Sequence, residues 1–226
     1  MSRAAPRRLR DLLVRRREVW TLTWPARLVL LALVSGAALL FARQAGNFLA
    51  VSEPGGGEYL VVEAWMPAYT YQVAAELWNT GRYRRVIAVR AVPDDALPGA
   101  GVTDYSAVGS LVRAGVPREV IVDAAGAGIQ KDRTFHSAMN LRHWLESANI
   151  TTASVDVLTL GPHARRSRLL FRKALGERFE VGVIAVADRR FDANHWWRTS
   201  EGVRSVLGEF IAYLYARFFF DAQNPG

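Results

Sequence analysis

The stretch from Val155 to Ser167 decides the fold and reads Val-Asp-Val-Leu-Thr-Leu-Gly-Pro-His-Ala-Arg-Arg-Ser. Its first six residues are mostly β-branched or apolar, which favours a buried strand. Gly161 and Pro162 then end the strand, and we expect a helix from His163 onward. A strand that passes through a short break into a helix is the repeating unit of an α/β fold.

The same alternation of strand and helix patterns continues on both sides of this stretch. It predicts a Rossmann-like three-layer α/β domain, with a mostly parallel sheet of about five strands and helices on both faces. The predicted strands are 59–63, 85–89, 120–123, 154–160 and 180–187. The predicted helices are 71–80, 105–114, 134–147, 163–175 and 199–219. With the strand order 3-2-1-4-5, the first and fourth strands meet where the order reverses, and ligands of such sheets bind there.

The N-terminal part of the chain has a different composition. Residues 1–27 contain eight arginines and two acidic residues, so they hold +6 of the net charge of +8. Residues 28–42 then carry no charge, and as a helix they would be about 22 Å long at ~1.5 Å per residue. Flanking Trp and Arg side chains extend the predicted transmembrane helix to residues 24–45. Because the basic charge lies in the tail and not over the folded domain, we expect no nucleic-acid partner.

This segment predicts membrane attachment through a single N-terminal helix. We favour an uncleaved anchor over a cleaved signal peptide, because the basic region is long and Leu40 or Arg43 would occupy the −3 position of a cleavage site. The positive-inside rule then places the tail, residues 1–23, in the cytoplasm and the C-terminal domain outside the inner or plasma membrane. Residues 46–57, with three consecutive glycines, predict a flexible linker before the domain at 58–226.

Candidate ligand-binding residues follow the first and fourth predicted strands. His163 and Arg166 lie in the first turn of a helix, and the backbone of that turn, from Gly161 onward, favours anions. Glu63 ends the first strand, where a carboxylate is costly unless it is paired or useful. It could be a general base, a metal ligand, the partner of Arg166, or a member of a structural ion pair. We single out Glu63 and His163 as candidate catalytic residues.

Further candidates lie at the start of the helix 134–147 and near the C-terminus. Lys131, Arg133 and Thr134 would add cations and a hydroxyl to an anion site, and Asp132 or Thr134 is the expected N-cap of that helix. Trp197 could roof the crevice, although adjacent tryptophans often simply pack. Glu209 interrupts an apolar helix face and suggests a buried pair with an arginine of the helix 163–175. The chain has no cysteine, and we assign no metal site.

Taken together, these segments resemble the YdcF/SanA/ElyC-like family of bacterial envelope domains. The resemblance covers about residues 59–219 and rests on Leu60-Val61-Val62-Glu63-Ala64-Trp65, Gly115-Val116-Pro117, Asp132-Arg133-Thr134, His163-x-x-Arg166, Trp196-Trp197-Arg198 and Glu209. It implies a Rossmann-type sheet, a tether of one helix, and a role in envelope integrity or in peptidoglycan or carrier-lipid metabolism. The chain departs from the family in two places. Many members have a Gly-Gly after the second strand, where this chain has Val89-Arg90-Ala91-Val92, and an acidic residue and an asparagine where it has His136 and Ser137.

Three functional hypotheses follow. In the first, the outer domain binds an envelope metabolite that carries a phosphate or carboxylate, with hydrolysis of a phosphoester or pyrophosphate as the simplest reaction. In the second, the protein is a non-catalytic accessory that binds another envelope component. In the third, suggested by one characterised relative, it binds S-adenosylmethionine or a nucleotide, but the first strand is not followed by a glycine fingerprint. The sequence does not identify a cofactor.

Overall fold

The computed structural model describes residues 20–91, 106–126 and 131–222. The chain divides into two units, residues 1–40 and 41–226, which we describe separately. Most of the predicted cytoplasmic tail and the predicted start of a helix at residue 105 lie outside the described residues.

Five parallel strands form the sheet of the second unit, in the order β3-β2-β1-β4-β5. The predicted α/β class and strand order are confirmed. The strands are β1 (Tyr59–Glu63), β2 (Arg85–Ala91), β3 (Ile121–Gly126), β4 (Ala153–Leu160) and β5 (Phe179–Val186). Every residue of the central strand β1 is buried, which explains its unbroken apolar run before Glu63.

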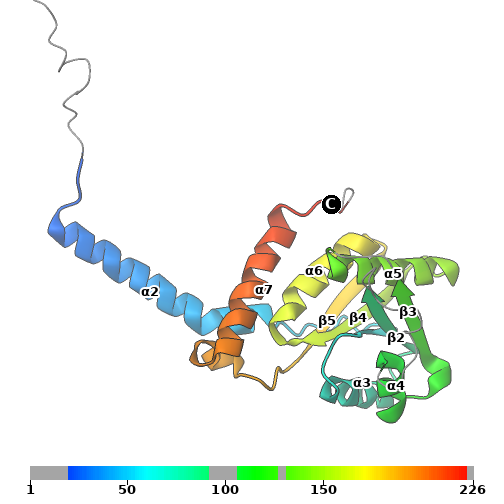
Figure 1. The fold of residues 1–226 in the computed structure, drawn as a ribbon. Coiled ribbons are helices and arrows are strands. Elements are labelled where there is room, and N and C mark those ends of the chain that lie inside the picture. Colours follow the sequence, from blue (N-terminus) through cyan, green and yellow to red (C-terminus); the bar gives the residue numbers. More distant parts are fainter. Residues whose placement is uncertain (1–19, 92–105, 127–130, 223–226) are drawn as a thin grey trace, which may run out of the picture. The chain divides into compact units, whose positions relative to one another are not determined.

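Helices cover both faces of this sheet (Figure 1). Helices α3 (Tyr69–Asn79) and α4 (Ala107–Arg113) pack on one face, around Leu60 and Val62 of β1. Helices α5 (Arg133–Ser147) and α6 (Ala164–Leu175) pack on the other, with Phe171 fully buried between them and the sheet. Helix α7 (Ser200–Phe218) packs along α6. The described residues of this unit also include three short 3-10 helices: η1 (Arg118–Val120), η2 (Gly161–His163) and η3 (Ala193–Arg198).

The helix α2 (Trp24–Leu49) begins in the first unit and is long and apolar enough to cross a membrane, as an anchor or as a signal sequence. Its last turns belong to the second unit, where Ala45 and Leu49 are buried against η3. Gly46 permits this packing, because a Cβ there would lie 2.1 Å from the carbonyl oxygen of Ala193. The helix therefore continues four residues beyond the predicted end at Ala45.

The segment expected to be a flexible linker is bound to the sheet. Glu53 forms an antiparallel bridge with Val183 of the edge strand β5. The backbone N–H groups of Gly55 and Gly57 donate to the buried carboxylate of Asp156, at 2.7 and 2.9 Å. A Cβ on Gly57 would lie 2.7 Å from the backbone nitrogen of Asp156, so this glycine provides a close approach and not flexibility.

Candidate functional site

A cavity of about 440 Å³ opens at the carboxyl ends of the strands, beside the first turns of α5 and α6. Its walls are mostly charged or hydroxylated side chains: Glu63, Trp65, Arg90, Asp132, Arg133, Thr134, Ser137, His163, Arg166 and Glu209. A second, more open depression of about 760 Å³ lies at the amino ends of β4 and β5. Ligands of parallel sheets bind at the carboxyl ends, so the first cavity is the candidate site.

The register of the sheet places Glu63 at the floor of this cavity. Val62 lies opposite Leu158 in the β1–β4 ladder, so Glu63 and Thr159 are the next residues on adjacent strands. Thr159 and Ser167 both donate hydrogen bonds to Oε2 of Glu63, the latter at 3.0 Å. Among the described residues, Oε1 of Glu63 is buried and has no hydrogen-bond partner. An unsatisfied buried oxygen is costly, and a donor on a ligand could satisfy this one.

His163 lies close to Glu63 because it belongs to the turn η2, which directly follows β4, the strand next to β1. Its Nε2 is 3.6 Å from Oε2 of Glu63 and 3.4 Å from Oγ1 of Thr134. Its Nδ1 is 2.9 Å from Oε1 of Glu209 on α7. The side chain is only 8% exposed, and the ring of Trp65 packs edge-on against it at 5.0 Å. Both nitrogens of the imidazole therefore face a carboxylate.

Arg166 completes the charged network one turn along α6. Its Nε and Nη2 donate to the two carboxylate oxygens of Glu209, at 2.8 and 3.1 Å. The predicted pair between Glu209 and an arginine of this helix is confirmed, although both side chains are half-buried and not buried. The suggested pairing of Arg166 with Glu63 is wrong, because Glu63 is bound by His163 and by two hydroxyl groups.

Burial and charge pairing shift the pKa values of this network in opposite directions. Burial raises the pKa of the Glu63 carboxyl, but the charge of His163 and three hydrogen bonds outweigh it and leave the pKa below its usual value. Burial lowers the pKa of His163, but Glu63 and Glu209 together raise it to about 9. Burial raises the pKa of Glu209, but His163 and Arg166 lower it to about 2. These shifts favour two ionised carboxylates and a protonated imidazole beside the guanidinium of Arg166, whose Nη2 also lies 2.9 Å from Nδ1 of His163.

Five of the predicted site residues meet at the cavity: Glu63, Arg133, Thr134, His163 and Arg166. Three others do not line it. Lys131 is exposed, and Gly161 is buried with a left-handed φ of 43°, lining a neighbouring cavity. Trp197 packs on Trp196 and His195, at ring distances of 6.0 and 5.6 Å.

Trp197 does not roof the crevice because the last turns of α2 fix the position of η3. The indole Nε1 of its neighbour Trp196 donates to the carbonyl of Ala42 at 2.7 Å, which holds this pair of tryptophans on α2. The aromatic side chain at the cavity is instead Trp65, which follows β1.

Arg90, Asp132 and Ser137 also line the cavity and were not among the predicted site residues. Arg90 lies at the carboxyl end of β2 and is 3.5 Å from Asp123, and Ser137 lies one turn after Thr134 on α5. The strand-end rule that identified Glu63 would also have identified Arg90. Asp132 occupies the N-cap position of α5 with a φ of 45°, but its side chain makes no capping hydrogen bond and lines the cavity instead.

This arrangement contains the groups for binding an anion and for proton transfer. Arginine side chains and hydroxyls hold phosphate or carboxylate oxygens, and a buried imidazolium can donate a proton. In the parts of the chain that the structure describes, no three histidine or acidic side chains are arranged to hold a metal ion.

The raised pKa of His163 predicts a loss of stability at alkaline pH. The folded-state pKa, about 9, lies above the unfolded value of 6.5, so the contribution is complete below about pH 6.5 and is lost as the pH rises through 9. We expect the free energy of unfolding to fall by an amount on the order of 3 kcal/mol over this range. Urea unfolding of the full-length chain in detergent at several pH values measures it.

Two variants identify the group responsible for this loss. Glu63→Gln removes a charge that holds the proton on His163 and should flatten the alkaline slope. His143→Gln changes an exposed histidine and should leave the slope unchanged. A wild-type profile that stays flat from pH 6.5 to 9 would contradict the assignment of a charged His163.

Comparisons of this chain with protein-family models, with curated proteins and with solved structures give no match.

Proposed function

We propose that the α/β domain binds a small anionic molecule, carrying a phosphate or a carboxylate, in the cavity at the carboxyl ends of the strands. The observation that carries this proposal is the convergence of three arginines and a histidine on one cavity: Arg90, Arg133, Arg166 and His163. The hydroxyls of Thr134 and Ser137 lie on the same wall. Guanidinium groups are the preferred partners of phosphate and carboxylate oxygens.

The cationic groups differ in how far they are already paired. Glu209 binds Arg166 through both of its oxygens, and Glu63 and Glu209 flank His163. Arg133 is exposed at the rim, and within the described residues no carboxylate lies within ion-pair distance of it. We therefore assign Arg133 the first contact with an incoming anion, and Arg166 and His163 the positive floor of the site.

Hydrolysis of a phosphoester is the reaction that these groups serve most directly. The arginines would hold the phosphate oxygens while a water molecule attacks the phosphorus. As the bond from phosphorus to the leaving oxygen breaks, His163 would donate its proton to that oxygen and take up the proton that the water loses, while the carboxylate of Glu63 favours the protonated imidazole. An accessory role without turnover is the alternative, and it is favoured by the pairing of both ring nitrogens with carboxylates. An assay for inorganic phosphate released from phosphoesters or pyrophosphate separates hydrolysis from an accessory role. Hydrolysis predicts release by the wild type and none by Arg166→Ala.

We place this domain at the outer face of the membrane, tethered by α2. The proposal is supported by the arginine-rich tail before an uncharged run of fifteen residues, and by the resemblance to the YdcF/SanA/ElyC-like family of envelope domains. In that setting the ligand would be an anionic metabolite of the cell envelope.

Replacing Arg133 by alanine should weaken anion binding about tenfold or more, the loss of one charge-assisted contact. The test is a thermal-shift titration of the full-length chain in detergent with inorganic phosphate, pyrophosphate and citrate. Arg84→Ala is the matched control, because Arg84 is an exposed arginine paired with Glu58 at the opposite end of the sheet. Equal binding by the two variants, or no shift of the wild type with any of the three anions, would contradict the proposal.

A further inference from the structure

The outward face of α7 is apolar in a way that is unusual for a surface helix. Between Arg204 and Arg217 lie twelve residues, about 18 Å of helix at ~1.5 Å per residue, and the only charged one is Glu209. Glu209 faces α6 and the cavity, so it contributes no charge to the outer surface. A helix that packs one face on a domain normally presents charged residues on the other.

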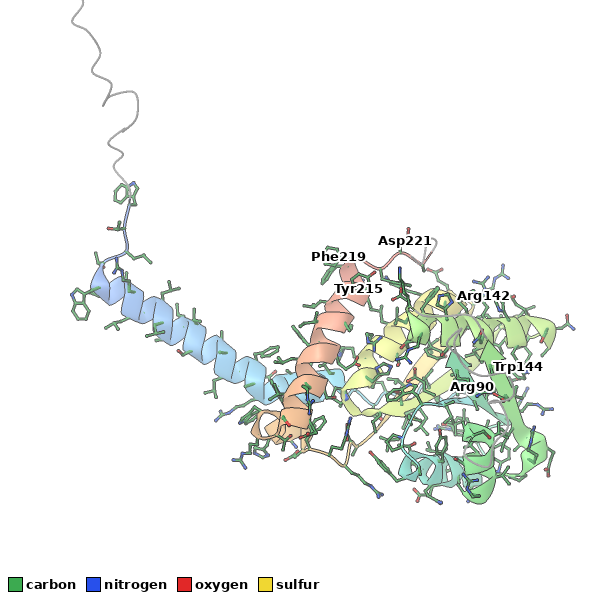
Figure 2. The ribbon with its side chains drawn as sticks, in the orientation of Figure 1. Arg90, Arg142, Trp144, Tyr215, Phe219 and Asp221 are labelled. Carbon is green, nitrogen blue, oxygen red and sulfur yellow. The ribbon has the colours of Figure 1, made fainter. Side chains whose placement is uncertain are left out.

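The exposed side chains on this face form what we call the α7 stripe: Leu207, Ile211, Tyr215, Phe218 and Phe219. The first three are spaced four residues apart, which places them on one side of the helix. Ile211 is 68% exposed, and Phe218 and Phe219 are 70% and 77% exposed. Figure 2 labels Tyr215 on α7 and Phe219 directly after its last residue. Contiguous exposed apolar residues of this size mark an interaction surface.

The side of α7 next to the stripe shows where the chain enters this unit. The ring of Phe41, the first residue of the second unit, packs on Phe210 of α7 with centroids 5.0 Å apart. Phe48 packs in the same way on Tyr213 at 5.9 Å. The residue before Phe41 is Leu40, the end of the first unit and part of the uncharged run 28–42. If that run lies in a bilayer, chain connectivity alone brings the membrane surface within a few residues of α7.

We infer that the α7 stripe is a membrane-docking surface, which inserts into the interface of the same bilayer that holds the N-terminal helix. Its composition suits that location, because leucine, isoleucine and phenylalanine enter the acyl boundary and tyrosine lies at the headgroup level. Arg204 lies one turn before the stripe and Arg217 within its last turn, and both would lie among anionic headgroups. We assign a lipid surface and not a protein as the partner of the stripe, because the uncharged run 28–42 adjoins this unit and would already hold a bilayer close to α7.

This inference is independent of the anion proposed for the cavity. It assigns α7 two roles, since Glu209 on its inner side belongs to the charged network and the stripe on its outer side contacts lipid. The domain would then lie against the membrane instead of extending away from it on its tether.

The chain has no cysteine, so single cysteines can be labelled without altering any native residue but one. We would place the polarity-sensitive fluorophore NBD on Ile211→Cys in the full-length protein, reconstituted into vesicles of phosphatidylcholine and phosphatidylglycerol. The matched control is Val112→Cys, an exposed apolar residue of α4 on the opposite face of the sheet. A second position on the stripe, Tyr215→Cys, guards against a local effect of one substitution.

Docking predicts that NBD on Ile211→Cys emits at shorter wavelength than on Val112→Cys. It should also lose most of its emission when lipids with a nitroxide high on the acyl chain are included, at a depth of about 5–10 Å. Equal quenching of both labels by aqueous iodide, with no effect of the nitroxide lipid, would overturn the inference. A label shielded from iodide but not quenched by the nitroxide lipid would overturn it as well, because a protein surface would then cover the stripe.

Discussion

Replacing His163 by leucine is expected to lower the free energy of unfolding by about 3–5 kcal/mol, the cost of removing one partner from a buried ion pair. Glu63 is almost fully buried, and its Oε2 lies 3.6 Å from Nε2 of His163. Without the imidazolium, only the hydroxyls of Thr159 and Ser167 would stabilise the carboxylate. Urea unfolding of the full-length chain in detergent, followed by tryptophan fluorescence, measures the change.

Two companion variants separate lost charge pairing from lost packing. His143→Leu makes the same replacement at an exposed position of α5 and should change stability by no more than about 0.5 kcal/mol. The double variant with Glu63→Gln and His163→Leu also removes the unpaired charge of Glu63, so much of the lost free energy of unfolding should be recovered. A double-mutant cycle measures this coupling. A loss below about 1 kcal/mol for His163→Leu alone would refute the charged network as a stabilising element.

Replacing Asp156 by alanine is expected to cost about 3 kcal/mol or more, since hydrogen bonds to charged groups contribute about 1.5–3 kcal/mol each. The carboxylate is fully buried and accepts from the N–H groups of Gly55 and Gly57 and from the hydroxyl of Tyr83, the last at 3.1 Å. The alanine variant leaves these donors unpaired. The change appears in the same unfolding experiment, and limited proteolysis should reveal faster cleavage within residues 52–58.

The matched control for Asp156→Ala is Glu177→Ala, which removes an exposed carboxylate after α6. It should leave both the stability and the cleavage pattern unchanged. Proteolysis of residues 52–58 at the wild-type rate in Asp156→Ala would mean that other contacts hold this segment to the sheet.

The fold could be predicted from the sequence because its signals are local. The run Tyr59–Glu63 and the break at Gly161-Pro162 each identify an element boundary, and the structure places β1 at the predicted residues. Strand β3 extends to Gly126, three residues beyond the predicted end, because the ladder with β2 continues as far as Ala91. Pairing between strands, which local composition does not encode, decides such ends.

The site could be predicted in part because one assumption, the strand order, brought Glu63 and His163 together. Which groups pair within it could not be predicted, since Glu209 is 43 residues from Arg166 and competes with Glu63 for the same cations. Similarly, the contact of Trp196 with Ala42 spans 154 residues and removes Trp197 from the cavity. The binding of the glycine run before β1 could not be predicted for the same reason, because its partner Asp156 lies about 100 residues away.

The bridge between Glu53 and Val183 has a consequence for any shortened form of the protein. The backbone N–H of Glu53 donates to the carbonyl of Val183 at 2.8 Å, and that of Val183 donates in return at 3.0 Å. A fragment that begins at the start of β1 would lose the bridge to Glu53. The backbone N–H and C=O groups of Val183 would then be unpaired, and unpaired groups on an edge strand can pair with strands of other molecules. Fragments made for crystallisation should therefore retain residues 50–58, which keep this part of β5 paired.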